Sequence, residues 1–404
     1  MPVETVEVSV THPYRVFIGA GLDLAEIFSR SLEPGLCAIL TDSTVGPLHA
    51  ARVQDSLQRA GWRVAGKIEV PSGESSKSLE VYADALSRLA RLGLTRDGTI
   101  FALGGGVVGD LGGFVAGTYM RGIDLVMLPT SLLAMVDSAV GGKVGVDLPE
   151  GKNLVGAFVR PRLVAADLDW VATLPEREIS NGLAETIKMG LLSGGDFFGD
   201  LGLIGAARTG DLDALQTLVL DSVSFKARVV AEDELEGGRR AILNYGHTIG
   251  HALEAAADYN LQHGQAVAAG MLAAASLSRH RFGRDLTRVH EDLIEAAGLP
   301  RRVPGVGVAI TGDIQGKIMT EVQPMKMAED SRLVTGGRPE IARVRLGSSA
   351  RASTVASGVT SDVGNPESLR RQIPRMPTAR APSSSSGRDR VRTAPTAKRV
   401  RAGG

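Results

Sequence analysis

The chain has 404 residues, 43% of them hydrophobic and 22% charged, a length that suits two domains and a composition typical of globular proteins. Its 45 Lys and Arg residues are matched by 45 Asp and Glu residues, so no net charge favours nucleic acid or a membrane surface as a partner. The single cysteine, Cys37, excludes an internal disulfide, and without a signal peptide or a membrane-spanning apolar run we expect a cytoplasmic protein.

Residues 1–174 alternate short apolar runs with amphipathic segments. The N-terminal segment alternates apolar and polar residues as a strand does. Strands that alternate with helices predict a parallel sheet covered by helices, which is an α/β domain. Beyond the N-terminus, the expected strands cover 37–42, 63–70, 98–106 and 124–130, and the expected helices cover 50–62 and 76–94.

From about Pro175 the apolar residues recur at helical spacing. The Leu174-Pro175 step interrupts the chain before the first of these helices, so we place a domain boundary there. We therefore predict an all-α domain over residues 175–345. Its expected helices cover 177–192, 213–234, 242–254 and 264–283.

The chain changes character after about Arg301. No Phe, Tyr, Trp, His or Cys occurs from there to Gly404, and the last part is mostly Ser, Arg, Ala, Pro and Gly. Such a segment has too little apolar surface to offset the entropy of ordering. We predict that the helical domain is atypical after about residue 300 and that 346–404 form a disordered tail. An Arg-rich arm that binds nucleic acid is the alternative.

Two histidines in the segment ILNYGHTIGHALE, His247 and His251, lie four residues apart and so on one face of a helix. The pair could hold a metal, divide its work between a metal and a substrate, or pack in a core. His263 makes three histidines within seventeen residues, which favours a site. The other histidines stand apart in the sequence, and we interpret them as surface or packing residues: His12, His49, His280 and His290.

A catalytic divalent metal usually takes three protein ligands, so we expect a carboxylate ligand on an element that faces the histidines. The segment GLAETIKMG offers Glu185, with Lys188 three residues later on the same helix face. A charged pair among apolar residues is unusual. An exposed helical ion pair is the alternative that spacing alone leaves open.

A glycine-rich segment, ALGGGVVGDLGG, comes at the end of the strand GTIFAL and satisfies G-x-G-x-x-G through Gly104, Gly106 and Gly109. Glycines let a backbone approach a pyrophosphate at the start of a helix. The motif alone is a weak signal, and it comes later in the chain than in an ordinary dinucleotide-binding domain. Asp42, at the end of an early strand, is better placed than Asp124 to bind a ribose.

Cationic side chains gather in two parts of the sequence. VDSAVGGKVGVDLPEGKNLVGAF carries Lys143 and Lys152, and Lys226 lies on the helical side. Several cations beside a metal imply a substrate with phosphate or carboxylate groups. Residues at four-residue intervals predict one continuous helical stripe of polar groups that leads to the histidines, with a solvated stripe as the alternative: Glu236, Arg240 and Asn244.

Together these motifs resemble the 3-dehydroquinate synthase family of sugar phosphate cyclases. The matching stretches follow the family order from about residue 40 to 275: PSGESSKS, LGGGVVGD, TYMRGI, PTSLLAMVDSAVGGK, GKNLVGAF, GLAETIKMGL, DELEGGRRAILNYGHTIGHALE and HGQAVAAGM. The resemblance implies a Rossmann-like NAD-binding domain over residues 1–174 and a helical metal- and substrate-binding domain after it. This is the fold that the family has in common with iron-dependent alcohol dehydrogenases.

The resemblance also implies roles for individual residues. A divalent metal, zinc or cobalt, is expected on Glu185, His247 and His263, which leaves His251 for the substrate. The expected substrate contacts are Asp137, Lys143, Lys152, Asn153, Lys188, Lys226, Glu236, Arg240, Asn244 and His251. The expected NAD contacts are Asp42, Ser72, Gly73, Glu74, Ser75, Ser76, Lys77, Gly105, Gly106, Val107, Val108, Gly109, Asp110, Thr130, Ser131, Lys143, Lys152 and Thr173.

The implied reaction converts 3-deoxy-D-arabino-heptulosonate 7-phosphate into 3-dehydroquinate and phosphate in the shikimate pathway, which supplies aromatic amino acids. NAD takes hydride from C5, phosphate is eliminated, hydride returns, and an intramolecular aldol reaction closes the carbocycle. NAD is regenerated in each turnover, so the implied enzyme is a lyase. The family also suggests a homodimer.

The C-terminal part departs from the family. Members carry an Asp-Lys-Lys motif whose lysine reaches the substrate, and Lys326 is the nearest candidate here. A shifted reading frame or a recombined end of the gene would explain the change. Three alternatives to the implied activity therefore stay open: a sister sugar phosphate cyclase, an alcohol dehydrogenase of the same fold, and an inactive or regulatory homologue.

Overall fold

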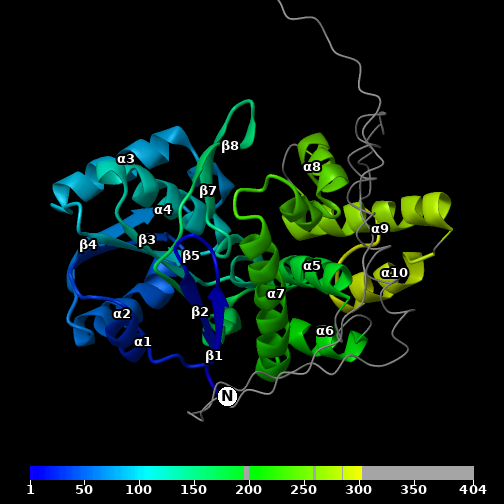
Figure 1. Ribbon diagram of the computed structural model, residues 1–404, viewed down its shortest axis with the longest axis horizontal. Helices are drawn as coiled ribbons and strands as arrows, with labels where there is room; N and C mark the ends of the chain where they lie inside the picture. The colour runs from blue at the N-terminus through cyan, green and yellow to red at the C-terminus, as the bar shows by residue number, and fades with distance from the viewer. Residues whose placement is uncertain (195–199, 258–260, 284, 303–404) are drawn as a thin grey trace, which may run out of the picture. The chain divides into compact units, whose positions relative to one another are not determined.

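The computed structural model describes residues 1–194, 200–257, 261–283 and 285–302 (Figure 1). Lys326, the predicted tail over 346–404 and most of the atypical segment after residue 300 lie outside the described residues.

A seven-stranded sheet forms the core of the N-terminal half, in the strand order β1-β2-β9-β6-β5-β3-β4. β1 is antiparallel to β2, and every other neighbouring pair is parallel. All residues of β5 and β9 are buried, as expected of parallel strands with helices on both faces. The strands are β1 (Glu4–Val8), β2 (Tyr14–Gly19), β3 (Leu36–Asp42), β4 (Arg63–Val70), β5 (Thr99–Gly104), β6 (Asp124–Pro129) and β9 (Leu163–Asp167).

Helices cover both faces of this sheet. Figure 1 shows α3 and α4 above the sheet and α1 and α2 below it. β3 has β4 on one side and β5 on the other, so the strand order reverses between β3 and β5. Ligands of open parallel sheets bind at the carboxyl ends of the strands at such a point. The helices are α1 (Leu24–Ser31), α2 (Val45–Arg59), α3 (Leu79–Arg91) and α4 (Gly106–Thr118).

A separate antiparallel hairpin, β7 (Lys143–Leu148) and β8 (Gly151–Phe158), follows the parallel strand β6. The Asp147 N–H donates to the carbonyl of Lys77 (2.7 Å), which ties the hairpin to the segment before α3. Nothing in the sequence analysis anticipated these two strands. The short helical turns of this half are η1 (Glu74–Ser76), η2 (Tyr119–Arg121), η3 (Ala134–Ser138) and η4 (Leu168–Thr173).

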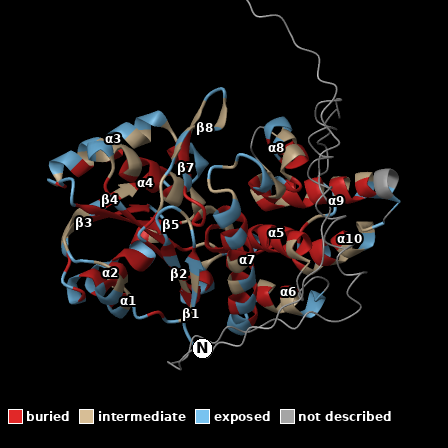
Figure 2. Ribbon diagram, in the orientation of Figure 1, coloured by how far each residue is buried: buried red, intermediate tan, exposed pale blue. Residues whose placement is uncertain are grey.

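The C-terminal half is helical, and α5 (Glu176–Ser193) is its central helix. Every residue of α5 from Ile179 to Leu192 is buried, and the helix contacts α6, α7, α9 and α10 (Figure 2). A helix that is buried on all sides belongs to a core. The other helices are α6 (Leu201–Arg208), α7 (Leu212–Glu232), α8 (His247–Ala256), α9 (His263–Phe282) and α10 (Thr287–Ala296).

The predicted helical stripe from Glu236 to Asn244 is wrong. Glu236 has a left-handed backbone (φ 59°), and a short 3-10 helix, η5 (Arg239–Asn244), separates it from α8. The carboxylate of Asp233 accepts hydrogen bonds from the backbone N–H groups of the turn at Gly237, Gly238 and Arg240 (2.7, 2.8 and 2.9 Å). A turn that an Asp side chain satisfies in this way competes with helix formation.

The predicted fold class, a parallel α/β sheet followed by helices, is confirmed. β9 ends at Asp167 and α5 begins at Glu176, and both halves belong to the same compact unit of the chain. The domain boundary at residue 174 stays a prediction. Among the described residues, no helix has the length and apolar character needed to cross a membrane.

Candidate active site

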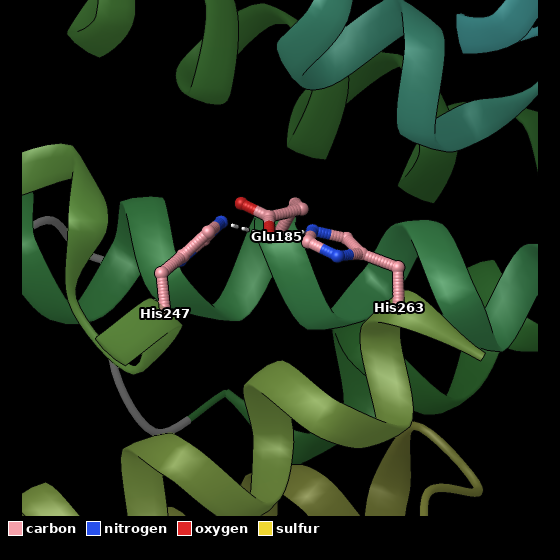
Figure 3. A group of neighbouring side chains, drawn as sticks. All are labelled: Glu185, His247 and His263. Atoms are coloured by element: carbon pink, nitrogen blue, oxygen red, sulfur yellow. Dashed lines mark hydrogen bonds and ion pairs between the residues drawn. The ribbon is translucent and has the colours of Figure 1, made fainter. Parts of the chain in front are cut away.

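Three potential metal ligands from three different helices meet at one point in the helical half (Figure 3). Glu185 comes from the middle of α5, His247 begins α8 and His263 begins α9. Oε1 of Glu185 lies 3.4 Å from Nε2 of His247 and 3.2 Å from Nε2 of His263. One ligand atom from each residue lies within 4.8 Å of the others, so a single ion could contact all three.

Glycines allow these helices to come so close. A Cβ on Gly270 would lie 1.9 Å from the carbonyl oxygen of Gly246, where α9 crosses the start of α8. A Cβ on Gly264 would lie 2.5 Å from the carbonyl oxygen of Asn181 on α5. Gly246 itself has φ +81°, which starts α8 at a sharp turn. Close helix packing therefore depends on small residues in each contact.

Burial and the neighbouring charges shift the pKa of each residue in this group. Burial raises the pKa of Glu185, but Lys188 and then the two histidines outweigh it and hold that pKa well below its ordinary value. Burial and the neighbouring Lys188 lower the pKa of His247 to about 3, so its imidazole is neutral. Burial opposes the protonation of His263, yet its contacts with the carboxylates of Glu185 and Glu254 raise its pKa to about 9.

Neutral imidazole nitrogens and a carboxylate are the ligands that zinc and cobalt take in proteins. His247 is already neutral, and its Nδ1 lies 3.2 Å from the carbonyl oxygen of Tyr245. A hydrogen bond from Nδ1 to a carbonyl leaves Nε2 for a metal. The donor set present at this point therefore fits a divalent cation.

The predicted substrate residues are distributed around this group as ion pairs. Lys188 pairs with Glu185, three residues earlier on α5, and both side chains are almost completely buried. The alternative of an exposed pair is thereby wrong. Lys226 on α7 donates to the carbonyl oxygen of Asp137 (2.6 Å) and pairs with its carboxylate, and this pairing lowers the pKa of Asp137 to about 2 against the effect of burial.

The hairpin brings two further lysines towards the helical half. Lys143 on β7 forms an ion pair with Glu236, and Lys152 on β8 lies 3.2 Å from Glu254 on α8. Asn153, next to Lys152, has a left-handed backbone (φ 56°) and accepts a hydrogen bond from Lys77 (2.6 Å). Residues from the two halves of the chain thus meet at the hairpin.

The remaining predicted substrate residues differ in exposure. Arg240 is buried and donates to the carbonyl oxygens of Gly141 (2.9 Å) and Glu234 (2.7 Å). Asn244 is exposed at the end of η5. His251 is exposed one turn after His247, with its ring centre 5.3 Å from that of His247 and 6.2 Å from that of His263.

Glu254 is the residue of this group that the sequence analysis missed. Its side chain is buried, and Oε1 lies 3.6 Å from Nδ1 of His263 as well as close to Lys152. Burial raises its pKa, but His263 and then Lys152 outweigh this and lower it to about 2. An acid three residues after His251, on the same face of an apolar helix, was the available signal.

Most of the predicted NAD residues lie at or just after the carboxyl ends of β3, β4, β5 and β6. Asp42 ends β3, and its Oδ1 accepts hydrogen bonds from the N–H groups of Thr44 (2.8 Å) and Val45 (2.9 Å) at the start of α2. Gly105 precedes α4 without any side-chain cap on the helix. An uncapped helix start offers N–H donors and the positive end of the helix dipole to an anion.

Side chains near Gly105 and Gly106 leave little space for larger residues. A Cβ on Gly105 would lie 3.4 Å from Oγ of Ser131, and one on Gly106 would lie 3.2 Å from Oγ of Ser138.

Lys77, which is 5% exposed, donates to Asp110 of α4 (2.8 Å) and lies 3.8 Å from Glu74.

Other predicted NAD residues lie in the core, in α4 or in hydrogen-bonded turns. Val108 packs in the core, and the Gly109 N–H donates to the Gly105 carbonyl inside α4, while Val107 is half-buried. Ser76 is buried, and Ser75 and Glu74 are exposed beside it. The Ser72 N–H donates to Oγ of Ser43 (3.1 Å), Gly73 has φ +103°, and the Thr130 N–H donates to the Gly104 carbonyl (2.9 Å).

Thr173 and His49 lie together near the end of β9. Oγ1 of Thr173 donates to the carbonyl oxygen of Trp170 (2.8 Å) and lies 3.1 Å from Nε2 of His49 on α2. His49 is therefore buried in a polar contact, and burial lowers its pKa. Its interpretation as a packing residue agrees with this position.

Comparison with known proteins identifies the family. Residues 67–181 match the model "3-dehydroquinate synthase N-terminal", and residues 182–315 match "3-dehydroquinate synthase C-terminal". The chain is 46% identical over 302 residues to a 3-dehydroquinate synthase of Symbiobacterium thermophilum, an alignment that covers 72% of this chain and 83% of the relative.

Solved structures agree with these matches. A 2-deoxy-scyllo-inosose synthase with carbaglucose-6-phosphate, NAD+ and Co2+ is 29% identical (TM-score 0.67; 79% of this chain and 87% of that chain). A 2-epi-5-epi-valiolone synthase from Streptomyces hygroscopicus subsp. jinggangensis 5008 with NAD+ and Zn2+ is 26% identical (TM-score 0.68; 79% and 89%). An iron-containing alcohol dehydrogenase from Thermotoga maritima, 14% identical, has the same fold (TM-score 0.53; 83% and 100%).

The fold is thus the one found in sugar phosphate cyclases and iron-containing alcohol dehydrogenases. Within this class, the chain belongs to the 3-dehydroquinate synthase family. The resemblance inferred from the sequence motifs is confirmed.

Proposed function

We propose that the protein is a 3-dehydroquinate synthase that converts 3-deoxy-D-arabino-heptulosonate 7-phosphate to 3-dehydroquinate and phosphate in the shikimate pathway, with catalytic NAD and a divalent metal. The observation that carries the proposal is the buried group of Glu185, His247 and His263, with Lys188 beside it and Lys152 close by. Two histidines and a carboxylate would hold zinc or cobalt, and the lysines would bind the anionic groups of the substrate.

The proposal of a bound metal rests on the ligand atoms that Glu185, His247 and His263 offer. His247 is neutral and offers Nε2, and Glu185 stays ionised because Lys188 and the histidines compensate for its burial. When bound, a divalent cation would act as a Lewis acid on a substrate oxygen. The 2-deoxy-scyllo-inosose synthase and 2-epi-5-epi-valiolone synthase structures hold Co2+ and Zn2+, respectively, which supports the same choice here.

The proposal of a bound NAD rests on the reversal of the strand order at the carboxyl ends of β3 and β5. Asp42 would bind the adenosine ribose, and the uncapped start of α4 at Gly105 would bind the pyrophosphate. When bound, NAD would accept hydride from the substrate and return it later in the same turnover. Both related synthase structures named above carry NAD+, which supports this cofactor.

The chain's own residues would hold one substrate pose through several steps. Lys152, Lys188 and Lys226 bring positive charge to the phosphate and carboxylate from β8, α5 and α7. His251, exposed beside the metal group, would hydrogen-bond the substrate. A substrate that is clamped at both anionic ends can undergo elimination and ring closure without release.

A sister cyclase that acts on a sugar phosphate without a carboxylate is the second candidate. The related structure with carbaglucose-6-phosphate is the specific observation in its favour. The higher identity to 3-dehydroquinate synthases, 46% against 29%, favours the first candidate. An inactive homologue stays a third possibility because of the unusual sequence after residue 300.

Phosphate release tests the proposal directly. Purified protein would be given the heptulosonate phosphate with NAD and zinc, and parallel reactions would contain EDTA or glucose 6-phosphate as substrate. We expect EDTA-sensitive release of phosphate from the heptulosonate phosphate alone, with no accumulation of NADH. Release from glucose 6-phosphate instead would favour the sister cyclase, and no release by folded, metal-loaded protein would favour the inactive homologue.

The sequence-based predictions of assembly, location and domain division are part of the same proposal. We propose a homodimer, a cytoplasmic location, and a division into an NAD-binding domain over 1–174 and a metal- and substrate-binding domain from residue 175. Sedimentation of the purified protein tests the first of these.

A further inference from the structure

Glu254 is a buried carboxylate whose position the proposed reaction does not explain. It lies in the last turns of α8, its residue is 2% exposed, and it belongs to neither the predicted metal ligands nor the predicted substrate contacts. A buried ionised carboxylate is costly unless it has charged or hydrogen-bonding partners. Its partners are His263 and Lys152.

The imidazole of His263 lies between two carboxylates. Its Nε2 faces Oε1 of Glu185 at 3.2 Å, and its Nδ1 faces Oε1 of Glu254 at 3.6 Å. Only one nitrogen of a neutral imidazole can ligate a metal, and the other then carries the proton. A carboxylate on the Nδ1 side selects the tautomer in which Nε2 is free and turned towards Glu185 and His247.

The same oxygen of Glu254 lies 3.2 Å from Nζ of Lys152 on the hairpin strand β8. Lys152 also lies 3.7 Å from Glu74, which follows β4. Glu254 therefore connects a helix that carries a predicted metal ligand with a strand that carries a predicted substrate lysine. A shift of the hairpin would act on His263 through this one carboxylate.

We propose that Glu254 is a positioning residue that orients His263 for the metal and couples that ligand to Lys152. This inference rests on the proposed function, because it assigns a role within the same metal site. Glu254 acts through its contacts with His263 and Lys152 and is not itself a metal ligand.

A second metal on His251, Glu254 and His263 is the competing interpretation, because ligand atoms of these three residues also lie within 4.8 Å of one another. Lys152 and His263 face the same oxygen of Glu254, Oε1, so the ammonium group opposes a cation there. At Glu185, Lys188 pairs with Oε2 and the two histidines face Oε1. Both groups would also need His263, whose Nε2 already faces Glu185. The positioning role accounts for the contacts of Glu254 with His263 and Lys152 without a second ion.

Cobalt binding by metal-free protein tests the role without reference to turnover. Titration with Co2+ against a chromophoric chelator gives the affinity, and the visible absorption of bound Co2+ reports the ligand geometry. We expect Glu254→Gln to weaken Co2+ binding about 10-fold and Glu254→Ala about 10- to 100-fold, as for other residues that orient a metal-binding histidine. Both variants should also alter the Co2+ spectrum.

Two control variants distinguish a loss of His263 orientation from a general effect of changing a charged side chain. Glu176→Gln removes a carboxylate that pairs with Arg208 on the surface, and it should bind Co2+ as the wild type does. Lys152→Met removes the other partner of Glu254 and leaves the contact with His263, so it should change the Co2+ spectrum through Glu254 but weaken Co2+ binding less than Glu254→Gln does. Far-UV circular dichroism of each metal-free variant checks that it is folded.

The outcomes are distinct. Wild-type affinity and an unchanged Co2+ spectrum in folded Glu254→Gln would overturn the inference, even if Glu254→Ala fails to fold. Binding of two Co2+ ions by the wild type, and of one by Glu254→Gln, would replace it with the two-metal interpretation. A wild-type protein that binds no Co2+ would instead refute the metal site of the proposed function.

Discussion

At the scale of single residues, the site depends on how buried polar side chains are paired. Glu185 and Lys188 are almost completely buried, and each would be costly in the core without the other. Pairing and burial also decide which histidines are charged, since His247 has a pKa of about 3 and His263 one of about 9 although both contact Glu185. The difference comes from Lys188 beside His247 and from the second carboxylate, Glu254, beside His263.

His290 shows the same principle away from the metal ligands. It is fully buried, Nδ1 lies 2.8 Å from the carbonyl oxygen of Leu286, and Nε2 lies 2.8 Å from the hydroxyl of Tyr245. Nδ1 must donate to the carbonyl, so in the neutral imidazole Nε2 accepts from Tyr245. Burial accordingly lowers its pKa from 6.5 to about 4.

This shift predicts a dependence of stability on pH. The unfolded chain binds a proton at His290 below about pH 6.5 and the folded protein only below about pH 4, so its stabilisation is full above pH 6.5 and is lost as pH falls towards 4. Between pH 7 and pH 4.5, the free energy of unfolding of the wild type should fall by about 2 kcal/mol more than that of His290→Gln. Urea unfolding of EDTA-treated proteins measures both. His12→Gln, at an exposed histidine, is the control, and equal pH slopes for all three proteins would contradict the prediction.

At the scale of helices, the metal group exists because α5, α8 and α9 approach one another more closely than large side chains permit. The closest approach is between Gly270 of α9 and the backbone of Gly246, directly before His247. Neither glycine belongs to a predicted contact with metal, NAD or substrate. Their role is to place the first turns of α8 and α9 side by side.

Gly270→Ala tests this packing. Its Cβ would lie 1.9 Å from the Gly246 carbonyl oxygen and 2.8 Å from the carbonyl carbon, so α8 and α9 would have to separate. We expect a loss of about 1–3 kcal/mol in the free energy of unfolding, together with weaker Co2+ binding because His247 moves. Urea unfolding and the Co2+ titration measure the two effects.

Gly205→Ala on α6 is a matched control, because nothing lies within 4 Å of a Cβ at that position. It should stabilise the protein slightly, by about 0.5–1 kcal/mol, as alanine does in an open helix position. A Gly270→Ala protein as stable as Gly205→Ala would show that α8 and α9 do not depend on this contact.

At the scale of the whole molecule, the α/β half and the helical half are joined by polar contacts. Glu234 accepts hydrogen bonds from Thr11 (3.2 and 2.7 Å) and pairs with Arg160, and Gln216 of α7 donates to the carbonyl of Pro2 (2.8 Å). Residues that would bind NAD come from one half and those that would bind metal come from the other. The proposed reaction therefore requires both halves to be folded.

Metal removal should lower the thermal stability of the whole chain. An ion held by ligands on three helices would favour the folded state by about 2.7 kcal/mol at 100 times its dissociation constant. For a chain of this size, the melting temperature should rise by roughly 5 °C on addition of Zn2+ to EDTA-treated protein. Scanning calorimetry measures the shift, and Mg2+ at the same concentration should produce little of it. A melting temperature unaffected by bound Zn2+ would contradict the prediction.

The sequence by itself determined the type of most elements. Short apolar runs predicted β3, β4, β5 and β6, and helical periodicity predicted α2, α3, α5, α7 and α9, because these patterns lie within one element. The motif order also identified the family. The roles of the individual site residues stay predictions until they are tested.

Only the tertiary structure decided what depends on contacts between distant residues. It broke the expected stripe between Glu236 and Asn244, since Asp233 caps a turn there. It formed the hairpin β7–β8, buried the Glu185–Lys188 pair, and brought Glu254 to both His263 and Lys152. Local periodicity reports which face of an element is apolar, but the partner of a buried charge is set by which elements pack against it.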